Sequence, residues 1–275
     1  MRRNWFGAFA LASIALLAGK AWHDTMREPV VRQIELPFDL RGRDALRIVL
    51  LADIHVAGPD MPPERLERIV GQVNALRPDL VLIAGDFVSD KRTATRHYTV
   101  AEALAPLAGL RPDIIRLAVP GNHDHWRDVE AIEHELAQHS IGLLRNQVVN
   151  ASGVIIGGLD DDFTGRADLE AVFQQVATFD GSALFLSHSP DPFADLPASS
   201  GIMLAGHTHC GQLAWPWGGS PSTMSEYGQR YACGVVRENG NVLVTSAGLG
   251  TSVLPIRLFT QPEIWVIDLV AIRDR

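Results

Sequence analysis

Five short clusters of polar side chains each stand directly after an apolar run, and their residue types are those that bind metal ions. The clusters are Asp53-Ile54-His55, Gly85-Asp86, Gly121-Asn122-His123-Asp124, His188 and Gly206-His207-Thr208-His209. Together they offer imidazoles, carboxylates and one amide oxygen, without a thiolate. That donor set suits Mn, Fe or Zn ions and differs from a structural zinc site.

Each cluster is weak evidence when it is taken alone. Asp53 and His55 are two residues apart, so both side chains would point to the same side of an extended strand end, but such pairs are common in loops. His188 alone would more often be a hydrogen-bonded histidine without a metal. Five such clusters in one chain are improbable by accident. They supply more ligands than one ion needs, which predicts two ions bridged by a carboxylate, about 3.5–4 Å apart.

The elements that must position these clusters follow from apolar periodicity. We predict helices over residues 63–76, 100–110 (interrupted at Pro106), 129–138 and 167–179. We predict strands over residues 30–36 (an edge strand), 46–52, 80–84, 114–119, 141–144, 147–149, 154–158, 183–187, 202–205, 235–236, 242–245 and 263–269, with a hairpin turn at residues 238–241. The alternation of strands and helices in the first half indicates an α/β fold with a largely parallel sheet. Ligands of such sheets bind beyond the carboxyl ends of the strands, where the clusters stand.

Composition limits the class of protein. The chain has 275 residues, of which 47% are hydrophobic and 20% charged, values typical of a globular protein. A net charge of −8 argues against nucleic-acid binding, and ten histidines fit a metal protein. Two cysteines, Cys210 and Cys233, are too few for a disulfide framework. One disulfide between them is open in an oxidising compartment, although a small buried thiol at Cys210 is the reading we favour.

The N-terminus resembles a targeting segment. Arg2 and Arg3 precede an apolar stretch over residues 5–19, which is short for a membrane span of roughly 20 residues and fits a signal sequence. We divide the chain into a signal peptide or signal anchor (residues 1–22), a polar linker with an edge strand (23–44) and one domain (45–275). Arginines before the apolar stretch favour anchoring in a bacterial inner membrane with the domain in the periplasm. Attachment on the cytoplasmic face is the alternative.

In order and spacing, the five clusters resemble those of the calcineurin-like metallophosphoesterases over most of residues 46–268. Residues 248–257 and the apolar N-terminus further resemble the membrane-anchored bacterial branch, which includes general phosphodiesterases and UDP-2,3-diacylglucosamine hydrolases of lipid A synthesis. The resemblance implies a four-layer α/β/β/α sandwich of two mixed sheets flanked by helices. It implies hydrolysis of a phosphodiester or pyrophosphate bond, with phosphomonoester hydrolysis or a non-catalytic metal-binding scaffold as alternatives.

The resemblance also implies roles for single residues. Two divalent ions, Mn²⁺ first and Fe or Zn as alternatives, would activate a bridging water. Their ligands would be Asp53, His55, Asp86 and His209 for one ion, and Asp86, Asn122, His188 and His207 for the other. His123 would assist the leaving group. Asp124 would either orient His123 or cap the following helix.

Several further expectations are open to test. We expect Asp160, Asp161 and Asp162 in an exposed acidic turn and His125 at the rim of the site. Arg166 and Arg230 are expected to be solvated or paired with a phosphate or a carboxylate. Trp215 and Trp217, with residues 254–258, are hypothesised to form a membrane-proximal substrate wall. The expected partners are a phosphate-ester substrate, which would be lipid-linked in the membrane-anchored branch, and the membrane itself through the N-terminal segment, with the protein a monomer.

Overall fold

The computed structural model describes residues 2–40 and 42–272. Residue 1 of the predicted targeting segment, residue 41 of the predicted linker and residues 273–275 of the predicted domain lie outside the described residues. Within this range the chain forms two mixed sheets of six strands each.

The first sheet comes mainly from the first half of the chain. Its strand order is β1 (Val30–Phe38), β12 (Glu263–Ala271), β2 (Ala45–Ala52), β3 (Leu80–Ala84), β4 (Ile115–Val119) and β5 (Gly142–Leu143). The strands from β2 to β5 pair in parallel, and β12 pairs antiparallel with β2 and parallel with β1. The predicted edge strand and the largely parallel pairing are confirmed.

The second sheet is built from the second half. Its strand order is β10 (Gly234–Glu238), β11 (Asn241–Thr245), β9 (Gly201–Ala205), β8 (Ala183–Leu186), β7 (Val154–Gly158) and β6 (Gln147–Ala151). The strands from β11 to β7 pair in parallel, while β10 and β6 pair antiparallel at the edges. The predicted hairpin joins β10 to β11, and its central residues Asn239 and Gly240 both have positive φ, as a type I′ turn requires.

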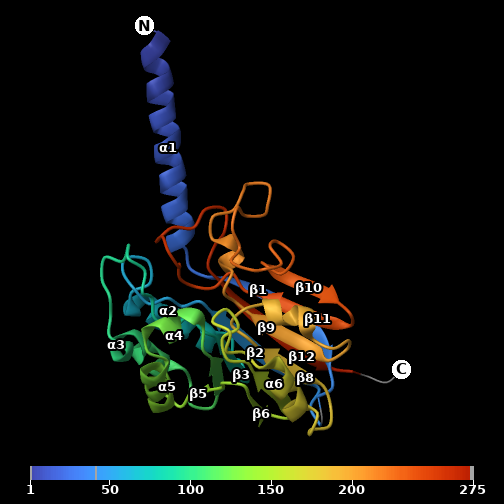
Figure 1. Ribbon diagram of the computed structural model, residues 1–275. Coiled ribbons are helices and arrows are strands. Elements are labelled where there is room, and N and C mark those ends of the chain that lie inside the picture. The colour runs from blue at the N-terminus through green and yellow to red at the C-terminus, as the bar shows by residue number, and fades with distance from the viewer. Residues whose placement is uncertain (1, 41, 273–275) are drawn as a thin grey trace.

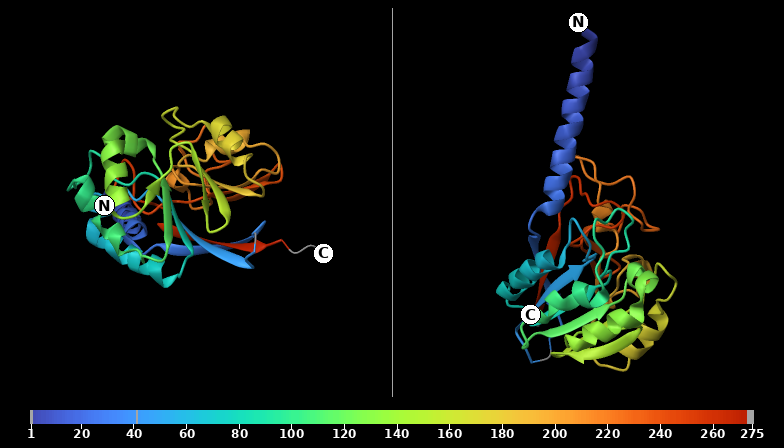
Figure 2. Two further views of the ribbon diagram at one scale, coloured as in Figure 1. Left: turned by 90° about the horizontal axis from the view of Figure 1, so that it is seen from below. Right: turned by 90° about the vertical axis from the view of Figure 1, so that its left-hand side faces the viewer.

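Three apolar clusters define four layers. Val49 and Leu51 of β2 pack toward the helices α2 (Pro63–Ala75), α3 (Val100–Leu104) and α5 (Val129–Gln138). Ile48 and Leu50 point the other way, into the cluster between the two sheets. A third cluster packs α6 (Leu169–Val176) on the outer face of the second sheet. Figures 1 and 2 show this α/β/β/α sandwich, which confirms the expected fold.

Two local differences from the sequence prediction have clear causes. The helix expected over residues 100–110 is α3 followed by a 3-10 helix, η1 (Ala105–Gly109), because Pro106 lacks the N–H that a continuing α-helix needs. No helix was predicted between residues 119 and 129, yet α4 (Asn122–Arg127) begins after β4. The carboxylate of Asp124 accepts a hydrogen bond from the Gly121 N–H and so caps this short helix.

The N-terminal helix α1 (Arg2–Met26) projects from the body (Figure 1), and among its described side chains those of Ala21, Asp24 and Thr25, at its foot, are buried. The prediction of a polar linker from His23 is wrong, because the helix continues to Met26 and buries Asp24 and Thr25. The guanidinium of Arg65, itself buried, donates to the carbonyl oxygens of Thr25 (2.9 Å) and Asp60 (2.6 Å). Among the described residues, α1 included, no helix combines the length and apolar character that a membrane crossing requires.

The hydrogen bonds of Arg65 yield a test of this docking. Arg65→Met leaves the Thr25 and Asp60 carbonyl groups buried without their donor, so we expect the free energy of unfolding to fall by about 2 kcal/mol. The matched control is Arg68→Met on the exposed side of the same helix, where we expect a change within about 0.5 kcal/mol. Urea unfolding of both variants measures the difference. Equal unfolding midpoints would show that the foot of α1 is not held in this way.

Candidate metal centre

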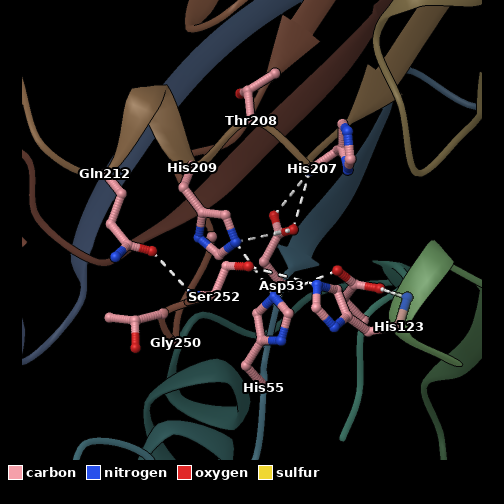
Figure 3. Close-up of polar contacts among 12 residues, drawn as sticks. Asp53, His55, His123, His207, Thr208, His209, Gln212, Gly250 and Ser252 are labelled. Carbon is pink, nitrogen blue, oxygen red and sulfur yellow. Dashed lines mark hydrogen bonds and ion pairs between the residues drawn. The ribbon is translucent and has the colours of Figure 1, made fainter. Parts of the chain in front are cut away.

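All five polar clusters meet at the facing carboxyl ends of the two sheets. The clusters after β2, β3 and β4 come from the first sheet, and those after β8 and β9 from the second. Figure 3 shows Asp53, His55 and His209 turned toward one another, with His123 beside them. Because the two sheets stack with these ends together, residues more than 150 positions apart in the sequence come into contact, as His55 and His209 do.

A first group of donor atoms surrounds His55. Its Nε2 lies 3.2 Å from Nε2 of His209 and 3.3 Å from Oδ2 of Asp86. Nε2 of His209 lies 3.6 Å from Oδ1 of Asp53. Metal–ligand bonds of about 2.0–2.1 Å at tetrahedral or octahedral angles separate neighbouring donors by about 3.0–3.4 Å. The four residues predicted for one ion therefore have the spacing of a coordination shell.

A second group shares the same carboxylate oxygen. Nε2 of His188 lies 3.3 Å from Oδ2 of Asp86 and 3.1 Å from Oδ1 of Asn122. Nδ1 of His207 lies 3.1 Å from the same His188 nitrogen. Oδ2 of Asp86 thus stands between the two groups, where the predicted bridging ligand should be.

The hydrogen bonds of the outer ring nitrogens support cation binding. Nδ1 of His188 bonds the Ala84 carbonyl oxygen at 2.7 Å, and Nε2 of His207 bonds the Met224 carbonyl oxygen at 3.1 Å. A carbonyl accepts only, so each of these nitrogens carries a proton. In the neutral tautomers the inner nitrogens then face each other with lone pairs, which is unfavourable unless a cation lies between them. The residues therefore fit divalent ions.

Burial controls the protonation of this site. Burial lowers the pKa of His55 to about 4 and of His207 to about 3, and also lowers that of His209. Burial raises the pKa of the Asp53 carboxyl to about 7. At His188 burial acts to lower the pKa, but the negative charge of Asp86 outweighs it and raises the pKa. Three imidazoles are thus neutral near pH 7, as metal ligands must be.

The backbone of the ligand loops is left-handed, which the sequence did not indicate. Five predicted ligands have φ between 49° and 68°: Asp53, His55, Asp86, His207 and His209. Non-glycine residues rarely adopt this conformation, and it clusters at functional sites. The expectation that Asp53 and His55 converge because the strand end is extended is therefore wrong in its reason, although the side chains do meet. A turn was expected at Gly121, but its backbone is extended; a Cβ there would collide with the Asp86 carboxylate, so only glycine fits.

His123 is oriented by a residue that the sequence analysis missed. Its Nδ1 lies 2.5 Å from Oδ1 of Asp90, and its Nε2 lies 3.4 Å from Oγ of Ser252. Asp124 instead uses both carboxylate oxygens on the backbone N–H groups of Gly121, Asp86 and Phe87. Asp124 therefore does not orient His123, and it caps the short helix α4 rather than the helix predicted over residues 129–138, which Asp128 caps. The sequence holds one indication of Asp90, because it is a carboxylate four residues after the predicted ligand Asp86.

A second missed residue is Arg257, whose side chain is fully buried behind the site. Its Nη2 lies 2.7 Å from the Ala247 carbonyl oxygen and 3.3 Å from Nδ1 of His209. Burial lowers the pKa of the guanidinium to about 10, so it stays charged near neutral pH. Gly248, in the segment that Arg257 holds, packs against Asp53 so closely that a Cβ would touch the carboxylate. Arg257 therefore fixes one wall of the first donor group.

Other residues differ from expectation. Asp160 and Asp161 are buried, and His125 is bonded to Asp160 at 2.6 Å with its side chain 3% exposed, so neither an exposed turn nor a rim position is correct. Asp160 also accepts from Arg145, which explains why a carboxylate can be buried there. The third acidic residue expected in the exposed turn, Asp162, is half-buried.

The two cysteines form a disulfide, Cys210–Cys233, rather than leaving a buried thiol at Cys210. The bond ties the loop that carries His209 to the segment before β10. Arg230 pairs with the carboxylate of Glu238 at 2.7 Å, as one of the two expectations had it. Arg166 is exposed.

A cleft of about 360 Å³ opens beside the donor groups. His123, His207 and His209 form its floor, and most of its wall is apolar. The apolar wall residues are Trp126, Phe163, Leu213, Pro221, Met224, Val253 and Leu254. Of the hypothesised substrate wall, Leu254 does line the cleft, while Trp215 lines a different cavity at the foot of α1.

Comparison with known proteins identifies a family whose chemistry agrees with the donor groups of the site. The model of the calcineurin-like phosphoesterase family matches residues 46–211. The chain is similar to metallophosphoesterase YkuE of Bacillus subtilis, with 28% identity over 97% of this chain and 95% of that protein. It is 29% identical to a transmembrane protein with metallophosphoesterase domain of Danio rerio, over 94% of this chain but 62% of that protein. Among solved structures, NAD nucleotidase of Haemophilus influenzae aligns with a TM-score of 0.48 and 15% identity over 74% of this chain and 51% of that chain.

Substitution of two carboxylates should separate metal binding from the orientation of His123. We expect Asp53→Asn to lower the bound metal from about two ions per chain toward one, because a neutral amide replaces a charged ligand. We expect Asp90→Asn to keep both ions and to lower the rate of phosphodiester hydrolysis about 10–100-fold, with a changed pH profile, because His123 loses its partner. Elemental analysis and initial rates measure both effects. Equal loss of metal in the two variants would contradict these assignments.

Proposed function

Because the chain belongs to the calcineurin-like phosphoesterase family and is a metal-dependent phosphoric ester hydrolase, we propose that its substrate is a phosphodiester with an apolar substituent, presented at a membrane surface. Hydrolysis of a pyrophosphate bond in a lipid-linked substrate would use the same site. The observation that carries the proposal is the composition of the cleft beside the donor groups.

The cleft combines an apolar wall with a lack of basic side chains. Of the described residues that line it, none is a lysine or arginine. A phosphomonoester carries nearly two negative charges at pH 7, whereas a diester carries one. Two divalent ions with no lysine or arginine beside them therefore suit the singly charged diester better. Burying an alkyl chain against the wall would add up to about 0.8 kcal/mol per methylene.

We assign the metal ligands as two groups that share Asp86. Asp53, His55 and His209 would complete the site of one ion, and Asn122, His188 and His207 that of the other. Bound ions would polarise the phosphate and lower the pKa of a coordinated water. Imidazole, carboxylate and amide donors suit Mn²⁺ first, with Fe or Zn as alternatives. His123 also lies within 4.8 Å of the donor atoms of His55 and Asp86, but its Nδ1 is committed to Asp90.

His123 is the group that would transfer a proton to the leaving alkoxide. The Asp90 carboxylate favours a proton on Nδ1 and holds the ring so that Nε2 faces the cleft. An imidazole that carries a proton on Nε2 would donate it to the departing oxygen. Ser252 lies at the same nitrogen and would help to align it.

Location at a membrane is supported by the exposed face of α1. Among its side chains, Phe9 is 76% exposed and Leu16 75% exposed, and the helix stands clear of the body in Figure 1 and in the right view of Figure 2. The name of the Danio rerio relative, a transmembrane protein, agrees with this location. The N-terminal segment would then serve as a signal anchor in a bacterial inner membrane.

The disulfide favours the outer side of that membrane. Structural disulfides persist in oxidising compartments such as the periplasm and are rare in the cytosol. A precursor of lipid A such as UDP-2,3-diacylglucosamine is made on the cytoplasmic side, so a periplasmic domain would not meet it. Within the membrane-anchored branch, a lipid-linked diester on the periplasmic face is therefore the substrate that we favour.

A chain-length series tests the proposal. The probes are p-nitrophenyl alkyl phosphodiesters of increasing alkyl length, with p-nitrophenyl phosphate as the monoester. Chelation should abolish hydrolysis and Mn²⁺ should restore it. We expect kcat/KM to rise with chain length, by at most about fourfold per methylene, and to exceed that of the monoester.

Paired variants test which residues cause the dependence of kcat/KM on alkyl chain length. Phe163→Ala and Leu254→Ser should flatten the dependence on chain length, because both residues line the cleft. Trp217→Ser is the matched control; this side chain is 80% exposed and outside the cleft, so the dependence should be unchanged. Preference for the monoester with no dependence on chain length would overturn the proposal, and full activity after chelation would contradict metal-dependent hydrolysis itself.

A further inference from the structure

A second cavity, of about 560 Å³, lies at the foot of α1. It is enclosed by the end of that helix, by residues 214–219 and by residues 259–263. The loop before β10, drawn in orange, stands beside the foot of α1 in both orientations (Figures 1 and 2). Cys210 and Ala247 belong to its wall, so the segments that carry His209 and hold Arg257 separate this cavity from the metal centre.

The charges around this cavity are unbalanced in favour of cations. Its basic residues are Lys20, Arg27 and Arg32, and its acidic residues are Asp24 and Glu263. Asp24 is already bonded to Lys20 at 2.8 Å and to the Phe259 N–H at 3.0 Å. Glu263 accepts from Arg32, from the Ala247 N–H and from the indole of Trp265.

Arg27 is the cation without a counter-charge. Among the described residues its guanidinium has no ion-pair partner, and Arg65 contacts only its backbone carbonyl. An arginine fork presents parallel N–H groups that match phosphate oxygens. The cavity therefore offers a monoanionic phosphate group one uncompensated guanidinium, with a second, from Arg32, nearby.

The rest of the wall is suited to an amphiphile. Trp215 lines the cavity and stacks on Trp217, with ring centroids 5.7 Å apart. Phe259 also lines it, and the Lys20 ammonium lies 4.8 Å from the centre of that ring. Tryptophans of this kind are enriched where membranes meet water. Beyond the cavity, α1 exposes large apolar side chains around its circumference, which are Phe9, Leu11, Ile14, Leu16, Leu17 and Trp22.

We propose that this cavity binds the headgroup of an anionic phospholipid whose acyl chains lie along the exposed apolar side chains of α1. The phosphate would meet Arg27 and Arg32, and the glycerol region would rest against Trp215. The site differs from the catalytic cleft, and the lipid bound there is not a substrate. The inference rests on the proposed position of α1 at a membrane and does not depend on the proposed reaction.

Binding of short-chain lipids to the purified full chain tests the site. The probe is dihexanoyl phosphatidylglycerol, with dihexanoyl phosphatidylcholine and inorganic phosphate as comparisons, followed by calorimetry and by tryptophan fluorescence. We expect one saturable site for phosphatidylglycerol and much weaker binding of the other two. Phosphate binding as tightly as the lipid, or equal binding of both lipids, would overturn the proposal.

Charge-matched variants identify the residues. Arg27→Gln with Arg32→Gln should weaken phosphatidylglycerol binding about tenfold or more. Arg77→Gln with Arg237→Gln removes the same charge at exposed positions outside the cavity, and its binding should equal that of the unaltered chain. Thermal unfolding confirms that both variants are folded. Equal binding by the Arg27 and Arg32 variant and its control would refute the site.

The same experiment separates this proposal from the proposed function. Phosphatidylglycerol is itself a phosphodiester, so binding is also measured on the metal-deficient Asp53→Asn variant, which should bind the lipid normally and lose that binding when Arg27 and Arg32 are changed. Loss of lipid binding in the Asp53→Asn variant alone would mean that the lipid occupies the catalytic cleft, which would contradict the inference even if the chain is an active diesterase.

Discussion

The carboxylate of Asp86 is the group on which the arrangement of the centre depends. Its Oδ2 lies 3.3 Å from both His55 Nε2 and His188 Nε2, and its Oδ1 accepts from the His123 N–H. Burial acts to raise the pKa of this carboxyl, but His188 and His55 outweigh it and lower the pKa, so Asp86 stays ionised. Its left-handed backbone is held by Asp124, and its space exists because residue 121 is glycine. One buried charge thus joins the two sheets.

Much of this architecture is readable from the sequence, since both faces of the central strands are buried and their apolar runs are continuous, as at β2 and β3. The glycine and ligand clusters identify the strand ends, and parallel topology brings them together. The helix α4 was missed because its first residues are polar ligands. The burial of Asp160 was missed because its partners, His125 and Arg145, are distant in sequence. The left-handed ligand backbone and the disulfide arise from tertiary contacts, which no local pattern encodes.

The cleft beside the metal ligands and the cavity at the foot of α1 differ in the charge of their walls. The cleft beside the metal ligands is apolar, with its positive charge to be supplied by ions, whereas uncompensated arginine charge gathers at the foot of α1. Arg65 and Arg257 connect the two regions, because both are fully buried and both bond to Thr25 of α1. The Arg65 guanidinium donates to the Thr25 carbonyl oxygen, and the Arg257 backbone N–H donates to the Thr25 hydroxyl oxygen. Because Arg65 and Arg257 tie the foot of α1 to the segments around the ligands, α1 would keep the cleft at a constant distance from a membrane.

The central claim is that two ions share Asp86, and crystals soaked in Mn²⁺ test it most directly through anomalous scattering. The account predicts two peaks, both at bonding distance, about 2.0–2.2 Å, from an oxygen of Asp86. One peak should also contact Asp53, His55 and His209, and the other Asn122, His188 and His207. A single peak at saturating Mn²⁺, or two peaks of which one lies away from Asp86, would contradict the account.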